Sequence, residues 1–362
     1  MGIEFSETGS KFFFYFVFIF SAINAGIAAN QYRANKYISR FFVLLAFVIL
    51  FIPLGFRSVG IDHGVYKEWY DHADYWLRLN YHLTPEPLFA WLTLFAKYVA
   101  GSFQLIYLFS AFVYLAGVFV FLRKSESFGY LSVFFMSISL YLYMCGLARI
   151  SIAIGIVSYA FTVLERKYKP LILILIACFF HYSSIITVLV YISYKNKRNV
   201  SFKNILYIIV GMLTLSFIIN RFGEVLPYAI MRYAGYVELS FCLGNITSVV
   251  ILLPALILWG LFKGGYKALY KEKYVFYDNI VKIVFGLICL SLLFNGVFRL
   301  AFFYYPIIAK IYFDFRRVLA ITNQGAVVPM YTGLFSVVGL VYVSVVFYDS
   351  PFITNLIIPF SM

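Results

Sequence analysis

The chain has 362 residues, of which 63% are hydrophobic and only 12% are charged. A soluble globular protein carries about 25% charged residues, so this composition excludes a water-soluble fold and predicts an all-α integral membrane protein. The formal net charge is +14, from 29 Lys and Arg against 15 Asp and Glu. In a membrane protein such a surplus collects in cytoplasmic loops, so it does not indicate a nucleic-acid partner.

Apolar segments and basic clusters together predict how the chain, 1–362, is threaded as a single polytopic membrane domain. We expect the N-terminus to lie outside, with every basic cluster on the inner side. An inverted N-terminus with one extra span is the alternative. The ten predicted spans are 12–30, 41–56, 103–122, 127–145, 149–164, 204–219, 245–262, 280–298, 300–315 and 326–347.

Four segments lie outside this simple pattern. Segment 57–87 is a long outer loop, and a second outer loop covers 220–244. Segment 88–100 is too short to span a bilayer, so we expect a helix that lies at the outer interface. The apolar segment 170–194 has basic clusters at both ends. It is therefore predicted to form a hairpin of two short helices that breaks around 179–184.

Two charged residues follow the second span directly and predict a polar group at the outer surface. Gly60 lets the chain turn tightly and would bring Arg57 and Asp62 together there. The alternative is structural: Arg57 reaches lipid phosphate from a helix end, with Asp62 as its partner.

Aromatic and charged side chains alternate further along the first outer loop. Tyr66, Trp69 and Tyr70 favour an aromatic belt at the membrane interface or a flat platform for sugar rings. The histidines of this loop lack the spacing of a metal site, so neither a metal nor another cofactor is predicted. Glu86 lies between two prolines in an extended stretch and is predicted to be a second outer carboxylate.

Several arginines begin or flank spans at their outer ends. Arg149 has no acidic neighbour in the sequence, and a helix N-terminus favours anions over cations. It either binds phosphate together with the free N–H groups of its helix or anchors the chain to lipid. Arg232 lies in the second outer loop, and Arg299 lies at an outer span boundary with Tyr304 and Tyr305 after it.

His181 lies in the middle of an apolar segment, at the tip of the predicted hairpin. It is either a hydrogen-bonded core residue or a group that reaches the substrate, for which a pKa near 6.5 suits proton transfer. The threading brings His181 and the outer arginines to one membrane face. A pocket rich in arginine suits a pyrophosphate, because the guanidinium stays charged and binds phosphate bidentately.

These residues resemble the EpsG-like branch of the Wzy-type polysaccharide polymerases. The resemblance covers roughly 50–310, and the usual small or acidic residue after Asp62 is His63 here. The matching motifs are Arg57-x-x-Gly60-x-Asp62 with Tyr66, Arg149-x-x-x-Ala153, and Phe180-His181-x-Ser183-x-Ile185, with Arg299 and its tyrosines as a late element.

The resemblance implies an enzyme of the bacterial cytoplasmic (inner) membrane. It would join undecaprenyl-pyrophosphate-linked oligosaccharide repeat units into an O-antigen, a capsule or an exopolysaccharide at the outer face. It also implies a plan similar to the GT-C glycosyltransferases, with membrane lipid around the substrate tail. A chain-length regulator and a flippase are the protein partners compatible with it, and neither a nucleotide sugar nor a metal is implied.

The predicted mechanism assigns a role to each charged group. Arg149 and Arg299 stabilise the leaving pyrophosphate, with Arg57 and Arg232 as supporting cations. The attacking hydroxyl needs a general base, for which Asp62 is the first candidate and His181 the second.

Two other functions are alternatives to polymerisation. A polysaccharide or lipid-linked oligosaccharide transporter would have polar residues near the bilayer midplane, whereas this sequence concentrates them on one side. A membrane acyltransferase acting on glycans would use His181, but the histidine has no acidic motif beside it.

Overall fold

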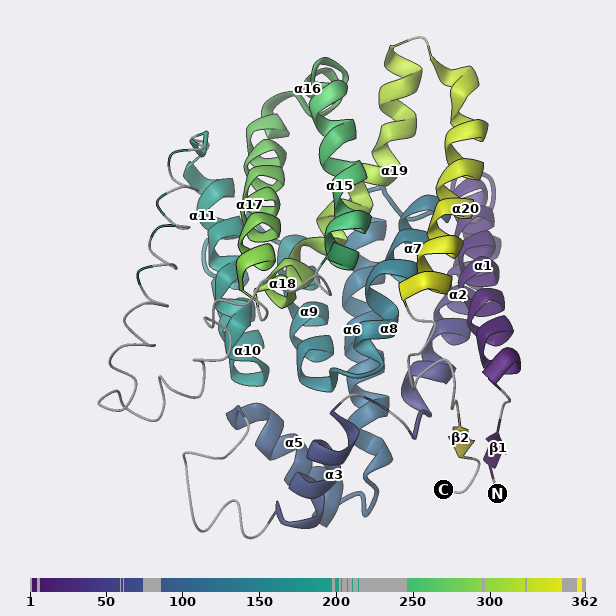
Figure 1. The fold of residues 1–362 in the computed structure, drawn as a ribbon, viewed down its shortest axis with the longest axis vertical. Coiled ribbons are helices and arrows are strands. Elements are labelled where there is room, and N and C mark those ends of the chain that lie inside the picture. The colour runs from purple at the N-terminus through teal and green to yellow at the C-terminus, as the bar shows by residue number, and fades with distance from the viewer. Residues whose placement is uncertain are drawn as a thin grey trace.

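The structure, a computed structural model, is built almost entirely from helices. It describes residues 2–4, 7–58, 60, 62–73, 86–196, 199–201, 203, 207, 210, 214, 246–294, 297–322, 324–346 and 357–359. The strands in this part of the chain are β1 (Gly2–Glu4) and β2 (Ile357–Pro359), which pair antiparallel and bring the two ends of the chain together (Figure 1).

Helices occupy most of each predicted span that the structure describes. The predicted outer loop 220–244 and nearly all of span 204–219 lie outside the described residues. The main helices are α1 (Glu7–Gln31), α2 (Lys36–Gly55), α6 (Gln104–Lys124), α7 (Tyr130–Met136), α8 (Leu142–Met144), α9 (Ala148–Phe161), α15 (Ile246–Leu261), α17 (Tyr274–Leu293), α19 (Tyr305–Ile321) and α20 (Val328–Val346). Short connecting elements are α16 (Lys263–Tyr270), α18 (Phe298–Ala301), the π-helical η1 (Ser137–Tyr141), and the 3-10 segments η2 (Tyr182–Thr187), η5 (Lys271–Lys273), η6 (Phe302–Tyr304) and η7 (Gly325–Val327).

The length and composition of these helices are those of a multi-pass membrane protein. Four described helical stretches are long and apolar enough to cross a bilayer: Phe12–Gln31, Lys36–Gly55, Gln104–Lys124 and Lys263–Leu292. Five shorter apolar helices accompany them: Tyr130–Met144, Ala148–Phe161, Lys169–Phe180, Leu252–Leu261 and Val328–Val343.

The predicted break at His181 is confirmed. Helix α10 (Lys169–Phe180) ends there, because His181 has extended backbone angles, φ −160 and ψ 111. After η2 the chain continues as α11 (Val188–Asn196). The hydroxyl of Tyr191 donates to the backbone oxygen of Lys167 over 2.6 Å, so the chain returns to the end from which α10 started. The segment is a hairpin.

Two glycines set the position of α9 against α6. A Cβ added at Gly117 would lie 1.9 Å from the backbone oxygen of Gly155, and one added at Gly155 would lie 2.2 Å from that of Val113. Small residues let membrane helices approach this closely. The crossing therefore fixes the helix whose first turn carries Arg149.

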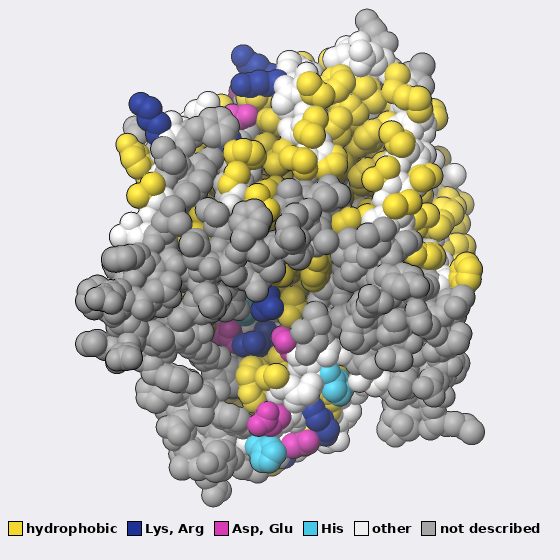
Figure 2. Space-filling model, in the orientation of Figure 1, with side chains coloured by type: hydrophobic (Ala, Val, Ile, Leu, Met, Phe, Trp, Pro, Cys, Tyr) yellow, Lys and Arg dark blue, Asp and Glu magenta, His cyan; other side chains and the backbone are white. Residues whose placement is uncertain are grey.

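Helices α3 (His63–Asp71) and α5 (Pro87–Tyr98) lie together at the end of the bundle where α6 and α9 begin (Figure 1). The ring of Phe89 packs between Tyr66 and Trp69, with centroid distances of 5.3 and 6.2 Å. Segment 88–100 is thus largely helical, as predicted. Charged and histidine side chains gather over this part of the molecule, below the apolar surface of the bundle (Figure 2).

Candidate active site

Glu86 is the centre of a buried polar cluster at this end. It directly precedes α5, while Arg149 lies in the first turn of α9 and His181 at the break after α10. Oε2 of Glu86 accepts from Nη1 of Arg149 over 2.7 Å, and Oε1 contacts Nδ1 of His181 at 3.1 Å. The Glu86 side chain is only 4% exposed. Three distant parts of the sequence therefore meet on one carboxylate.

The two partners keep this carboxylate ionised. Burial alone would raise the pKa of Glu86, but the hydrogen bond with His181 and the charge of Arg149 outweigh burial and lower that pKa to about 2. The sequence offers Arg149 no acidic neighbour, but in the fold it pairs with Glu86. Its partner is 63 residues away in the chain.

Aromatic rings surround the guanidinium of Arg149. Its central carbon lies 4.9 Å from the centroid of Trp69 and 5.9 Å from that of Tyr66. The Tyr66 hydroxyl donates to Oδ2 of Asp62 over 3.2 Å, and burial raises the pKa of Tyr66 to about 12. Within the described residues, Nε of Arg149 is buried without a hydrogen-bond partner. The cation is thus held by one acid and two rings, with one N–H still available.

Arg57 is a second buried cation in this region, with 1% of its surface exposed. Its guanidinium lies over the ring of Tyr107, 4.0 Å from the centroid, and donates to the backbone oxygen of Leu54. Among the described residues it forms no ion pair, with Asp62 or any other acid, and its Nε and Nη2 have no hydrogen-bond partner. Within the described part of the chain, Arg57 therefore has unused donors and a charge without a counterion.

Gly60 packs closely against the backbone of the turn before α9. A Cβ at this position would lie 3.0 Å from the backbone oxygen of Cys145, and the N–H of Asp62 donates to the backbone oxygen of Gly146 over 3.4 Å. The N–H of His63 donates to the backbone oxygen of Gly60 over 3.0 Å, so the chain turns tightly at this glycine, as expected. The contacts with Cys145 and Gly146 join the loop of Arg57 to the turn before Arg149.

His63, the residue that departs from the family pattern, contacts the same tyrosine as Arg57. Its Nδ1 lies 2.8 Å from the hydroxyl of Tyr107. Burial, helped by the charges of Arg57 and Lys67, lowers the pKa of His63 below its usual value, so the ring is neutral at pH 7. Sequence reasoning missed Tyr107, although a tyrosine in the first turn of a predicted span was the available signal.

The late element of the family pattern, Arg299 with Tyr304 and Tyr305, lies near the hairpin that carries His181. The charge of Arg299 acts on His181, and the hydroxyl of Tyr304 donates to the backbone oxygen of Ile186 over 3.1 Å. Tyr304 and Tyr305 are completely buried; Tyr304 is bonded to the η2 segment that follows His181, whereas Tyr305 packs against Phe135 and Phe302. Tyr70 is partly exposed and packs edge-on against Phe103.

Two further observations concern the predicted residue Arg232 and the possibility of a metal ion. Arg232 lies outside the described residues. In the part of the chain that the structure covers, no three His, Cys, Asp or Glu side chains lie close enough together to hold a metal ion.

This fold and site define a class of protein: a multi-pass helical membrane protein whose helical bundle has a site lined by arginine and carboxylate groups at one end. The sequence profile of the EpsG family matches residues 40–362. The chain therefore belongs to the EpsG family, whose members are linked to polysaccharide biosynthesis in the membrane. Comparison with curated proteins and with solved structures gives no match.

Proposed function

We propose that this protein is a Wzy-type polymerase that joins undecaprenyl-pyrophosphate-linked oligosaccharide repeat units into a surface polysaccharide. The observation that supports this most directly is the Glu86–Arg149–His181 cluster, at the end of the bundle where Arg57 also has guanidinium N–H groups without a partner among the described residues. Such a site combines donors for a pyrophosphate with a histidine held for proton transfer. Membership of the EpsG family agrees with it.

In the reaction, the bond between the sugar anomeric carbon and the pyrophosphate oxygen of the donor breaks. A hydroxyl of the incoming repeat unit forms the new glycosidic bond and gives its proton to a base. Negative charge grows on the departing pyrophosphate, so preorganised cations lower the barrier. Arg57 and Arg149 are the proposed ligands of that group, with Arg299 and Arg232 as further cations.

His181 is the stronger candidate for the base. Its Nδ1 faces Glu86, so a proton on Nδ1 leaves the lone pair of Nε2 to accept the proton of the sugar hydroxyl. Asp62 accepts a hydrogen bond from Tyr66 and is the alternative base. Glu86 is a positioning residue in this proposal, because a carboxylate with a pKa of about 2 is a weak base.

The aromatic side chains are proposed to hold sugar. Trp69 and Tyr70 are partly exposed, and Trp69 lies against the guanidinium of Arg149; flat rings suit the apolar faces of pyranoses. Tyr66 is buried and orients Asp62 instead.

The proposal includes a location and a topology. We place the site at the outer face of the bacterial inner membrane, in one domain of ten spans plus the 170–194 hairpin, with a GT-C-like plan. Basic residues at the opposite end of the described bundle support this orientation. A chain-length regulator and a flippase are the proposed protein partners.

Complementation of a strain that lacks the gene tests this function. We expect Arg149→Ala and His181→Ala to leave single repeats on lipid, while Arg166→Ala, which changes an exposed arginine in the loop after α9, gives a normal glycan ladder. If Asp62→Ala alone abolishes the ladder, Asp62 is the base. Normal ladders in folded Arg149→Ala and His181→Ala proteins would refute the site.

A further inference from the structure

A cavity of about 410 Å³ lies at the opposite end of the bundle from Glu86. Helix α6 connects the two places: it begins at Gln104 near Arg57 and ends at Lys124 beside the cavity. Its 21 residues span about 30 Å at 1.5 Å per residue. The cavity is therefore separate from the candidate active site.

Arginines dominate the lining of this cavity. Arg33, Arg123, Arg316 and Arg317 line it, with Glu126 as the acidic residue of the lining. Arg317 lies 3.7 Å from Glu126 and 3.3 Å from Asp314. Within the described ranges, Arg33, Arg123 and Arg316 form no ion pair with any carboxylate. The cavity thus has a surplus of positive charge.

Aromatic contacts hold the cations in place. The guanidinium of Arg316 lies 3.8 Å from the ring centroid of Phe313, and that of Arg123 lies 6.0 Å from the ring of Tyr32. Phe313 is itself confined, because a Cβ on Gly129 would approach its ring to 2.5 Å. The donor groups are therefore preorganised.

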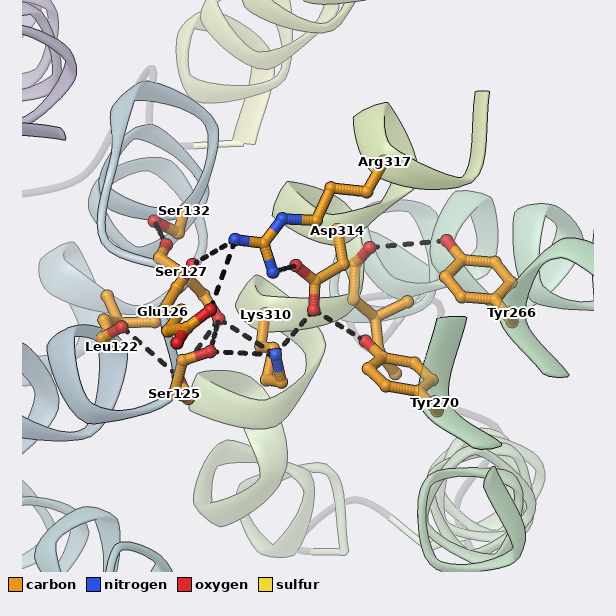
Figure 3. A network of polar contacts seen from close by, with 11 residues as sticks. Leu122, Ser125, Glu126, Ser127, Ser132, Tyr266, Tyr270, Lys310, Asp314 and Arg317 are labelled. Carbon is orange, nitrogen blue, oxygen red and sulfur yellow. Dashed lines mark hydrogen bonds and ion pairs between the residues drawn. The ribbon is translucent and has the colours of Figure 1, made fainter. Parts of the chain in front are cut away.

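A polar network fixes the wall beside the cavity (Figure 3). Asp314 accepts from Nζ of Lys310 over 2.5 Å and from the hydroxyl of Tyr270 over 2.9 Å. Lys310 also donates to the backbone oxygen of Ser125 over 3.0 Å. Because Asp314 also pairs with Arg317, that arginine is already engaged, and Arg123 and Arg316 remain as available donors.

Topology explains the presence of these arginines but not their convergence. Basic residues favour the inner side of a membrane protein and the C-terminal ends of helices. Arg33 follows α1, Arg123 ends α6, and Arg316 lies near the end of α19. Like charges that meet around one partly buried cavity repel one another, and an anion bound between them removes that repulsion.

We propose that this inner cavity binds a phosphate group. Guanidinium groups bind phosphate bidentately, and the lining also includes Val43 and Phe128, which suit the adjoining part of an amphiphile. The phosphate belongs to an anionic phospholipid headgroup or to a soluble phosphate. The site does not depend on the polymerase proposal, because it uses none of the same residues.

Binding to the purified full-length protein tests the proposal. Native mass spectrometry in detergent would measure binding of short-chain phosphatidylglycerol, zwitterionic phosphatidylcholine and inorganic pyrophosphate. We expect a saturable anionic ligand for the wild type and about tenfold weaker binding for Arg123→Ala/Arg316→Ala, since two charge-assisted contacts are lost. Arg166→Ala is the matched control and should bind like the wild type.

A lysine variant separates binding from folding and topology. Arg123→Lys/Arg316→Lys keeps the positive charge on this side of the membrane but loses the bidentate donors, so its affinity should fall between wild type and the alanine variant. Saturable phosphatidylglycerol binding identifies a lipid headgroup, and saturable pyrophosphate binding identifies a soluble phosphate. Equal binding by wild type and both double variants, or no saturable anion at all, would overturn the proposal.

Discussion

Replacement of Glu86 by glutamine tests the candidate site most directly. Glutamine keeps the shape of the side chain but removes the charge that holds Arg149 and His181 at 2.7 and 3.1 Å. The pKa of Glu86 falls from 4.5 to about 2 in the folded protein. At about 1.4 kcal/mol per pKa unit, its surroundings favour the charged form over a neutral one by about 3 kcal/mol.

Glu86 keeps both partners in the productive arrangement, so removal of its charge should slow transfer by about 100-fold, the size of effect that a misplaced catalytic group has. The measurement is the rate at which purified protein elongates a lipid-linked repeat unit, together with the glycan ladder in cells.

Glu68→Gln is the matched control for this experiment. Glu68 lies in α3 of the same outer region, but its side chain is exposed. This variant should retain the wild-type rate. A Glu86→Gln protein that melts like the wild type and elongates glycans at more than half its rate would refute the positioning role of Glu86.

Three further predictions concern packing, burial and pH. Gly155→Leu should force α9 away from α6, because even a Cβ would lie 2.2 Å from a backbone oxygen, and should lower both the melting temperature and the polymerisation rate. Asp314→Ala leaves Lys310 buried without its carboxylate and should lower the free energy of unfolding by about 3–5 kcal/mol. Asp71→Ala breaks an ion pair that is half exposed and should lower it by less than about 1 kcal/mol. Denaturant unfolding of the two variants measures both values. Because its folded pKa is depressed to about 2, Glu86 stabilises the fold above pH 4.5 and loses this contribution as the pH falls through 2. The melting-temperature difference between wild type and Glu86→Gln should therefore be constant from pH 8 to 5, and a difference that shrinks between pH 7 and 5 would contradict the depressed pKa.

Features that depend on local sequence could be predicted well. The helices could be predicted because each one coincides with a long apolar run in the sequence, and hydropathy depends only on residues that are neighbours in the chain. The break at His181 was also predictable, because two basic flanks do not fit one crossing and a polar Ser pair follows the histidine. The structure has extended backbone there.

Features that depend on distant contacts could not be predicted. Glu86 and Arg149 are separated by 63 residues, and no periodicity in the sequence connects them. The contact of Gly60 with the turn before α9 is likewise a property of the fold. In both cases the sequence indicates that the residue is unusual, but only the packing of α3, α5 and α9 gives it a partner.

The pairing of Arg149 changes how the charges of the site should be understood. Its charge is balanced by Glu86 before any ligand binds, so Arg149 alone adds little net attraction for a pyrophosphate. Arg57 is more deeply buried than Arg149 and has no carboxylate partner in the described structure. A buried guanidinium without a counterion is costly, and an anionic ligand would relieve that cost. Two groups therefore have different roles in the proposed site. Arg57 supplies the uncompensated charge that attracts the donor, and Glu86 keeps Arg149 and His181 in position for the transfer.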